Sequence, residues 1–270
     1  FSSFSINELN LYGITLKRKA INTSFFPNNI EEEINHLTKL YKPHDQILNY
    51  KNGDPFKSGE ACKKSFYFLR GELGEHFKDH YIENNFKKKY DGKDIGLIDI
   101  YNPQLIFSSN HWINKILNES KKIIKDKIDF ESKNIFYTHS NLYIYKNVSK
   151  PRCLHIDSYK KQFKCFIPLT PSIDKEKGCY AFVPSSHKFP LISLQLMGRL
   201  FNFIISNSDL GYQPGGDASL FHIDAALPIL AKPRDIIITC QKGVHGDIPS
   251  NNPIDRYLLV LNYLAGEWNF

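Results

Sequence analysis

The spacing of apolar positions along this chain changes near its midpoint. Up to about residue 133, apolar residues recur at helical spacing in several stretches, among them Ile30 to about Tyr41 and Glu72 to Phe86. Ser5, with Glu8 three residues later, has the pattern of a capping box, and Asn29 can cap the helix that begins at Ile30. The first half is therefore predicted to be mainly helical.

A further helix is predicted after Asn102. This residue is a favourable N-cap, and Pro103 would occupy the first helical position, where a missing backbone N–H does no harm. Apolar residues from Leu105 to Leu117 then follow at helical spacing. We expect these N-terminal helices to act as a scaffold for the second half of the chain.

From about Ile135 the apolar residues occur in short β-branched and aromatic runs. Pro, Gly, Asn and Lys separate these runs, which is typical of strands joined by turns. The expected strands are Ile135–Tyr137, Leu142–Tyr145, Cys153–Asp157, Phe163–Leu169, Cys179–Val183, Asp235–Cys240 and Arg256–Leu264. Many short strands of this kind predict a double-stranded β-helix (a cupin-like jelly roll) packed against the helices, so the fold class is mainly β or α+β.

No linker, internal repeat or low-complexity tract divides the chain. We therefore expect a single domain over residues 1–270, with a mainly helical scaffold at 1–133 and the jelly-roll core at 134–270. A segment at about 190–233 interrupts the strands with a helix-like stretch and a Gly-rich turn at Pro214-Gly215-Gly216. Long insertions between core strands commonly cover a site, so this segment is predicted to be lid-like.

Composition and charge narrow the class of protein. The five cysteines are scattered and form no CxxC pair, which argues against a zinc knuckle and a disulfide framework and for a reducing compartment, most simply the cytoplasm. No apolar run approaches the roughly 18 residues of a membrane span. The net charge of +7 comes from dispersed lysines without interleaved arginine and aromatic residues. We expect neither nucleic acid nor a membrane as partner, and the oligomeric state stays open.

The candidate chemistry lies on the predicted strand that contains Leu154-His155-Ile156-Asp157. Residues two apart on a strand face the same side, so His155 and Asp157 present an imidazole and a carboxylate together. These are two of the three ligands that non-haem Fe(II) oxygenases use, and the third is a distant histidine. His245, just after the predicted strand Asp235–Cys240 and flanked by small residues, is the candidate for it.

Arg256 opens the last apolar strand, eleven residues after His245. Its guanidinium is always charged and fork-shaped, which suits the far carboxylate of 2-oxoglutarate.

A His-x-Asp triplet is also common as an ordinary surface or core pair, and this chain contains a second one at His222 and Asp224. About twenty residues separate the second triplet from His245, which leaves room for two strands at most. A jelly roll needs more strands than that between its two ligand positions. The first triplet is therefore favoured, and His222 and Asp224 are assigned to the insertion.

The stretch from His155 to Arg256 resembles the phytanoyl-CoA dioxygenase family of Fe(II)- and 2-oxoglutarate-dependent oxygenases. The resemblance covers about the C-terminal half, and its pieces follow the family's order and spacing. The pieces are His155-Ile-Asp157, Phe166-Ile-Pro-Leu169 leading to Asp174-Lys-Glu-Lys-Gly178, Val183-Pro-Ser-Ser-His-Lys188, Lys232-Pro-Arg-Asp235, and His245-Gly-Asp-Ile-Pro-Ser-Asn251 followed by Arg256.

This resemblance implies an enzyme that holds Fe(II) with His155, Asp157 and His245, uses 2-oxoglutarate and O2, and binds the far carboxylate of 2-oxoglutarate with Arg256. It implies hydroxylation, desaturation or cyclisation at an unactivated C–H bond, with release of succinate and CO2. The substrate would be a small molecule, either a metabolite, which can be anionic, or a natural-product intermediate. Asn141 and Tyr143, on the preceding strand, are weaker candidates for contacts with the co-substrate.

Two residues depart from the family's pattern. Ile156 stands where a polar residue often assists the co-substrate, and Asp247 stands where a small hydroxyl residue commonly helps to hold its carboxylate. Asp247 would either repel that carboxylate or pair with Arg256. The departures keep a second class open, a jelly-roll binding or scaffold protein without activity. A nucleic-acid demethylase is less favoured, because no second arginine follows Arg256 in the last strand.

Overall fold

The computed structural model describes residues 4–40, 66–69, 97–105, 107–148, 154–157, 161–171, 178–188, 216–217, 223–248 and 254–265. Within these residues the strands form two antiparallel sheets. The larger sheet contains, in spatial order, β1 (Ile14–Lys17), β10 (Ile236–Cys240), β6 (Gln162–Pro168), β12 (Ile254–Ala265), β4 (Ile135–Val148), β3 (Leu97–Tyr101) and β2 (Phe66–Leu69). The smaller sheet contains β8 (Gly216–Asp217), β5 (His155–Ile156), β11 (His245–Asp247), β7 (Tyr180–Phe182) and β9 (Leu227–Pro228).

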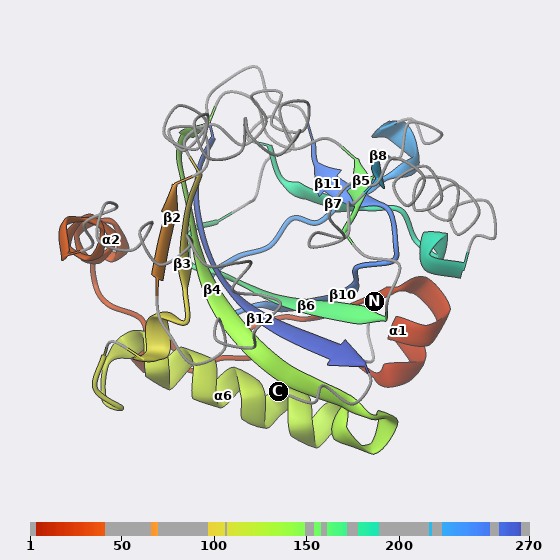
Figure 1. The fold of residues 1–270 in the computed structure, drawn as a ribbon, viewed down its shortest axis with the longest axis horizontal. Helices are drawn as coiled ribbons and strands as arrows, with labels where there is room; N and C mark the ends of the chain where they lie inside the picture. Colours follow the sequence, from red (N-terminus) through yellow and green to blue (C-terminus); the bar gives the residue numbers. More distant parts are fainter. Residues whose placement is uncertain are drawn as a thin grey trace, which may run out of the picture.

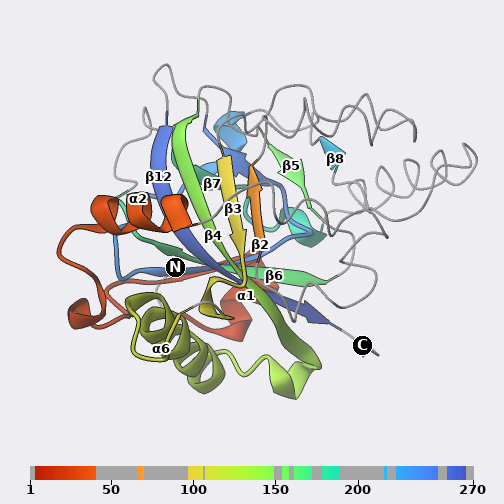
Figure 2. The same ribbon diagram turned by 60° about the vertical axis from the view of Figure 1, so that its left-hand side comes forward.

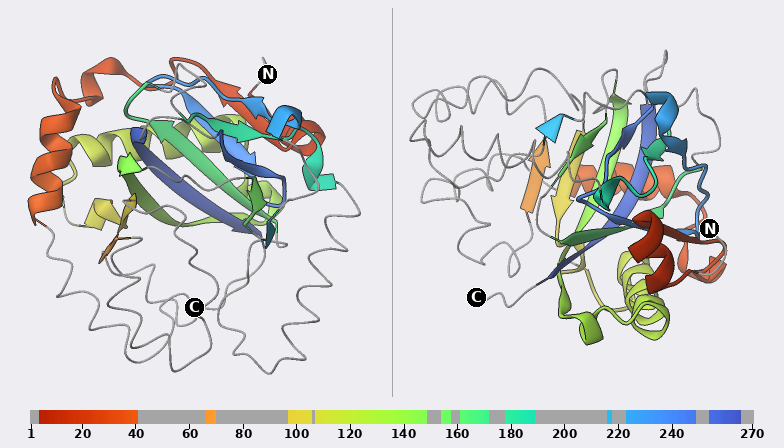
Figure 3. Two further views of the ribbon diagram at one scale, coloured as in Figure 1. Left: turned by 90° about the horizontal axis from the view of Figure 1, so that it is seen from above. Right: turned by 90° about the vertical axis from the view of Figure 1, so that its right-hand side faces the viewer.

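The two sheets face each other, and helices cover the outer side of the larger one. Figure 1 shows the larger sheet curving around the space in front of the smaller sheet, with α6 (Trp112–Lys127) across its back. Figure 2 and the two views of Figure 3 show the same layers, with α1 (Ile6–Tyr12) and α2 (Ile30–Leu40) also outside the sheets. The expected jelly-roll core with N-terminal scaffolding helices is confirmed. The described helices include none that is long and apolar enough to span a membrane.

Short 3-10 turns connect these elements. They are η1 (Thr23–Phe25), η5 (Pro103–Leu105), η6 (Glu131–Lys133), η8 (Ser186–Lys188) and η9 (Ile223–Ala225). The insertion predicted at about 190–233 lies largely outside the described residues, which include only β8, η9, β9 and a short stretch after β9 from it.

The strand alternation divides the larger sheet into two chemically different faces. Outward-facing residues of β4, β6, β10 and β12 pack with α1, α2 and α6 in one large core that includes Leu9, Leu37, Ile116, Leu142, Phe163, Cys165, Ile167, Ile238, Leu259 and Leu261. The residues between them face inward. Phe166, Ile237, Leu258 and Val260 belong to a second cluster that also contains Phe182 of the smaller sheet. The period of two therefore places one set of residues under the helices and the other between the sheets.

Two of the predicted helix starts are confirmed. The hydroxyl of Ser5 accepts a hydrogen bond from the Glu8 backbone N–H at 3.3 Å, and Asn29 accepts one from the Glu32 N–H at 3.2 Å. The helix predicted after Asn102 was wrong in its start. Asn102 has φ 45° and precedes only the turn η5, while α6 begins ten residues later, at Trp112, with His111 as its cap. The helix predicted at Glu72–Phe86 lies outside the described residues.

The strand predictions located the later strands but missed the early ones. β1, β2 and β3 all come from the first 133 residues, which the apolar spacing assigned mainly to helices. β4 is one strand of 14 residues, where two short strands were expected. Its polar stretch from Thr138 to Asn141 separates the two expected strands, but β12 pairs with His139, Ser140 and Asn141, and β3 pairs with Asn141. Pairing with a neighbouring strand overrides the weak local preference for strand.

Gly13 ends α1 in a left-handed conformation, φ 79°, and its N–H donates to the Leu9 carbonyl. A Cβ at this position would lie 2.6 Å from Nδ1 of His187 and 3.0 Å from Cζ of Phe182. The residue must therefore be glycine for two reasons, the backbone angle and the closeness of its neighbours.

We expect Gly13→Ala to lower the free energy of unfolding by about 2–4 kcal/mol, measured by urea denaturation. Asn134→Ala is the matched control. Asn134 has the same left-handed backbone, φ 54°, but is exposed. Its replacement should lower the free energy of unfolding by only about 1 kcal/mol. Equal losses in the two variants would show that the contacts with Phe182 and His187 contribute nothing.

Candidate metal centre

The structure brings His155, Asp157 and His245 together on the smaller sheet. His155 lies on β5 and pairs directly with His245 on β11, and Asp157 follows β5. Their ligand atoms all lie within 4.8 Å of one another. His155 Nε2 is 3.2 Å from Asp157 Oδ1, and His245 Nε2 is 3.6 Å from Asp157 Oδ2. Two imidazole nitrogens and one carboxylate therefore converge on one point, as a metal site with open positions requires.

The tautomer of His245 is set by the turn between β10 and β11. Its Nδ1 lies 2.8 Å from the carbonyl oxygen of Gly243, which can only accept, so Nδ1 carries the proton. The Nε2 lone pair then faces Asp157 and is free to bind a metal. A Cβ on Gly243 would lie 2.4 Å from Cζ of Phe182, so the glycine two residues before His245 lets this turn approach β7.

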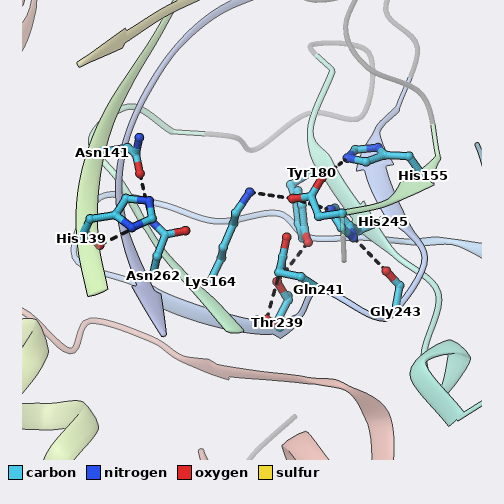
Figure 4. Close-up of polar contacts among 11 residues, drawn as sticks. His139, Asn141, His155, Lys164, Tyr180, Thr239, Gln241, Gly243, His245 and Asn262 are labelled. Carbon is cyan, nitrogen blue, oxygen red and sulfur yellow. Dashed lines mark hydrogen bonds and ion pairs between the residues drawn. The ribbon is translucent and has the colours of Figure 1, made fainter. Parts of the chain in front are cut away.

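Lys164 lies on β6 and reaches across from the larger sheet to this centre. Its Nζ is 2.6 Å from Oδ2 of Asp157, and both side chains are about five-sixths buried, with 16% and 15% of their surface exposed. Figure 4 shows Lys164 pointing toward the two histidines. Burial raises the pKa of Asp157, but the charge of Lys164 and the contacts with the two imidazoles outweigh it and hold the pKa well below its usual value. Asp157 is therefore ionised at neutral pH.

A row of polar side chains crosses the inner face of the larger sheet at the level of Lys164. Thr239 of β10 and Asn262 of β12 are the strand partners of Lys164, and His139 of β4 is the partner of Asn262. On β6, β10 and β12 the next residue along this face is apolar, namely Phe166, Ile237 and Val260, while β4 continues with Asn141. The inner face is thus polar beside the candidate ligands (Figure 4) and apolar further along three of the four strands.

Arg256 lies at the start of β12 and is almost fully buried, with 4% of its surface exposed. One terminal nitrogen donates to Oδ1 of Asp247 at 2.8 Å, the other donates to the Gly178 carbonyl at 2.7 Å, and the guanidinium lies 4.3 Å from the ring centre of Tyr145. Burial lowers the pKa of Arg256, but Asp247 and Tyr145 more than compensate and keep it protonated. Of the two outcomes foreseen for Asp247, pairing with Arg256 is the one that the structure contains.

Three further residues lie beside the triad that the sequence did not single out. Tyr180 Oη is 3.1 Å from Thr239 Oγ1, and its ring lies 5.9 Å from that of His245. The side chain of Gln241 donates to Thr239, while its Oε1 is buried without a hydrogen-bond partner in the described part of the chain. Lys164, Tyr180 and Gln241 carry a faint sequence signal, a polar residue at alternate positions of an otherwise apolar strand.

The contacts of Asn141, Tyr143 and Ile156 are with groups outside the triad. Asn141 is buried in a hydrogen-bonded chain, since it donates to Asp99 at 2.7 Å and accepts from Asn262 at 2.8 Å. Tyr143 is half-buried on the same strand. Ile156 packs in an apolar cluster with Ala181, Val183 and Val244, so its position serves packing within the smaller sheet. Asp224 is exposed in η9, and His222 lies outside the described residues.

The Arg256–Asp247 pair generates a stability prediction. Asp247→Asn leaves a buried guanidinium without its counter-charge, so we expect it to lower the free energy of unfolding by about 3–5 kcal/mol. The double variant Asp247→Asn/Arg256→Gln removes both charges and should lose clearly less than the sum of the two single variants. The exposed pair Lys125–Glu131, 3.7 Å apart, is the control. There Glu131→Gln should change the free energy of unfolding by less than about 0.5 kcal/mol. Additive losses at Asp247 and Arg256 would contradict this account of the pair.

His139 generates a pH prediction. Burial lowers its pKa, and the charge of Lys164 lowers it further, to about 3. Because the folded pKa lies below the unfolded value near 6.5, the stabilisation is complete above pH 6.5 and declines as the pH falls toward 3. From pH 7 to pH 5 this residue should account for a loss of about 2 kcal/mol.

The variant His139→Phe keeps an aromatic ring to stack on Tyr101, which lies 4.9 Å away, and removes the titration. Urea denaturation at pH 7 and pH 5 should therefore show a smaller pH effect in His139→Phe than in the parent. His36→Asn, on the exposed side of α2, should behave like the parent. An equal pH effect in parent and His139→Phe would show that His139 remains protonatable in the fold.

Comparison with known proteins gives a likeness in structure only. No family model matches the sequence, and no curated protein matches it. The epimerase SnoN, in complex with Fe3+, alpha ketoglutarate and nogalamycin RO, matches with a TM-score of 0.54 at 12% identity, over 96% of this chain and 82% of SnoN. EvdO2 from Micromonospora carbonacea var. aurantiaca, complexed with 2-oxoglutarate, matches with a TM-score of 0.52 at 11% identity, over 97% of this chain and 89% of EvdO2. At such low identity the likeness shows that this chain shares their fold.

Proposed function

We propose that this chain is an Fe(II)- and 2-oxoglutarate-dependent oxygenase that oxidises an unactivated C–H bond of a small molecule. The observation that carries the proposal is the convergence of His155, Asp157 and His245 between the two sheets. The shared fold with SnoN and EvdO2, whose structures are described with Fe3+ and alpha ketoglutarate and with 2-oxoglutarate respectively, supports it.

The donor set fits ferrous iron. Two neutral imidazoles and one carboxylate are the ligands of the facial triad of non-haem Fe(II) oxygenases, which leaves three positions open. A structural zinc site would need a fourth protein ligand, and the described residues place no cysteine or further acidic residue in this group. His245 is already held in the tautomer that binds a metal, by its bond to the Gly243 carbonyl.

The residues around Arg256 fit a carboxylate ligand in part. Arg256 Nε is buried and has no hydrogen-bond partner among the described residues, so the guanidinium still has a donor to offer. Asp247 cancels its charge, however, and holds one of its terminal nitrogens. Arg256 is therefore proposed as the residue that orients the far carboxylate of 2-oxoglutarate by hydrogen bonding, with Asp247 fixing the position of the guanidinium.

Iron with 2-oxoglutarate and O2 would supply the oxidising chemistry, with succinate and CO2 as the co-products. The chain itself positions the metal ligands and keeps water away from the centre. The strand pairing of β5 with β11 holds the two imidazoles side by side, and Gly243 fixes the orientation of one of them. The apolar inner residues next to the centre, among them Phe166 and Val260, exclude water from it.

The reaction is proposed to be hydroxylation, desaturation or cyclisation. Halogenation is disfavoured because Asp157 occupies the position at the metal that a halide ion would need. The polar row of Thr239, Lys164, Asn262 and His139 supports a substrate with hydrogen-bonding or anionic groups. The description of SnoN as an enzyme bound to nogalamycin RO supports natural-product intermediates as the class to test first.

A jelly-roll binding protein without activity is the second candidate. The pairs Lys164–Asp157 and Arg256–Asp247 favour it, because each buried charge is already compensated within the chain. Such a protein would not bind 2-oxoglutarate at the metal centre, even if Fe(II) is bound there.

The test measures Fe(II) binding under anaerobic conditions, then the visible band that forms when 2-oxoglutarate is added. We expect one Fe(II) per chain in the parent, and at least a tenfold loss of affinity in His155→Ala and His245→Ala, because each removes one of three protein ligands. Asp224→Ala and His222→Ala, in the second His-x-Asp triplet, are the matched controls. A loss in these controls with full affinity in the triad variants would move the site to the second triplet. Iron binding without any band would favour the second candidate.

A further inference from the structure

The Lys164 ammonium group lies next to a candidate metal ligand. An ammonium group 2.6 Å from a ligand oxygen opposes a divalent cation at the same carboxylate, so its presence there requires a reason. The neighbouring residues on the inner face, Thr239, Asn262 and His139, are uncharged at neutral pH. The described residues thus place one cation in an otherwise neutral polar row.

The balance of charge supplies that reason. A divalent metal held by Asp157 and two neutral imidazoles has one excess positive charge. The buried Arg256–Asp247 pair adds none, because its charges cancel. A 2-oxo dicarboxylate brings two negative charges, one more than this centre can balance. An unbalanced buried charge is strongly unfavourable, and Lys164 removes the imbalance. In the family pattern that this chain resembles, a small hydroxyl residue stands in place of Asp247. The arginine at the position of Arg256 then keeps a positive charge that no neighbouring carboxylate cancels.

The position of the ammonium group decides which end of the co-substrate it serves. Lys164 Nζ is bonded to Asp157, so it lies beside the point where the ligands converge. Arg256 lies at the other end of the inner face, six residues before Asn262, the strand partner of Lys164. The two cations therefore lie at different levels of the inner face, with Lys164 beside the candidate ligands.

We propose that Lys164 is a co-substrate-binding residue that interacts with the metal-chelating end of the 2-oxo acid and replaces the positive charge that Asp247 cancels at Arg256. This inference rests on the proposed function and adds a residue to it. The competing account is that Lys164 only positions Asp157. Its loss would then weaken metal binding, and any effect on the 2-oxo acid would follow from that.

The experiment uses protein loaded with Mn(II), which has no redox reaction here, and calorimetric titration with two 2-oxo acids. One is 2-oxoglutarate. The other is 2-oxopentanoate, which has the same five-carbon chain with a methyl group in place of the far carboxylate. Lys164→Met should weaken both acids, because the contact is to the chelating end that they share. The loss should be about 30-fold or more for 2-oxoglutarate, as expected for one buried charge-assisted contact, and smaller for 2-oxopentanoate, whose single charge the metal centre already balances. Lys164→Arg should restore most of this affinity. Asp247→Asn/Arg256→Gln should weaken 2-oxoglutarate and leave 2-oxopentanoate within a few-fold of the parent.

The control is Lys161→Met, an exposed lysine just before β6 whose loss changes the net charge equally. It should bind both acids like the parent. Mn(II) titration comes first, and Lys164→Met should bind Mn(II) no more weakly than the parent, because a competing cation is gone. Weaker Mn(II) binding in Lys164→Met would overturn the proposal in favour of positioning. Unchanged affinity for both acids, or a loss confined to 2-oxoglutarate, would overturn it as well. A parent that binds Mn(II) but neither acid would instead refute the proposed function.

Discussion

Two buried ion pairs join the two sheets, and the organisation of the space between them depends on both. Lys164 of the larger sheet meets Asp157 at the end of β5, and Arg256 of the larger sheet meets Asp247 on β11. A buried charge is tolerated only when it is paired, so each cation must keep its partner within reach. The pairs thereby fix how the smaller sheet lies over the larger one, and they bring the two histidines to a defined place above the polar row.

The alternation of strand residues makes this arrangement possible without weakening the core. Outward-facing residues of β4, β6, β10 and β12 bury their apolar side chains under α1, α2 and α6. The stability of the molecule therefore lies mainly on the side of the larger sheet that no ligand can reach. The inner face is free to carry charged and polar groups, which cost stability, because the outer core compensates for them. A shift of any of these strands by one residue would exchange the two faces.

The sequence was informative where one local rule decides the structure. The strand period predicted that His155 and Asp157 share a face, and capping chemistry predicted the starts of α1 and α2 correctly. It failed where distant partners decide. The strand β1, Ile14–Lys17, alternates apolar and polar residues over only four positions, too few to predict a strand or its pairing with β10 from the far end of the chain. Lys164 could not be recognised for the same reason, because its contact with Asp157 arises from the way two sheets face each other.

The ring of Phe182 connects α1 with the turn that precedes His245. It is fully buried, it packs against Gly13 at the end of α1, and it also packs against Gly243, whose carbonyl orients His245. A rigid aromatic ring between two glycine backbones transmits displacement, since neither contact has a flexible side chain to absorb it. Substitutions in α1 would thus displace the imidazole of His245, which follows more than two hundred residues later in the chain. In directed evolution of this protein, the first helix is a place from which the reactivity of the centre can be adjusted without touching any residue that lines it.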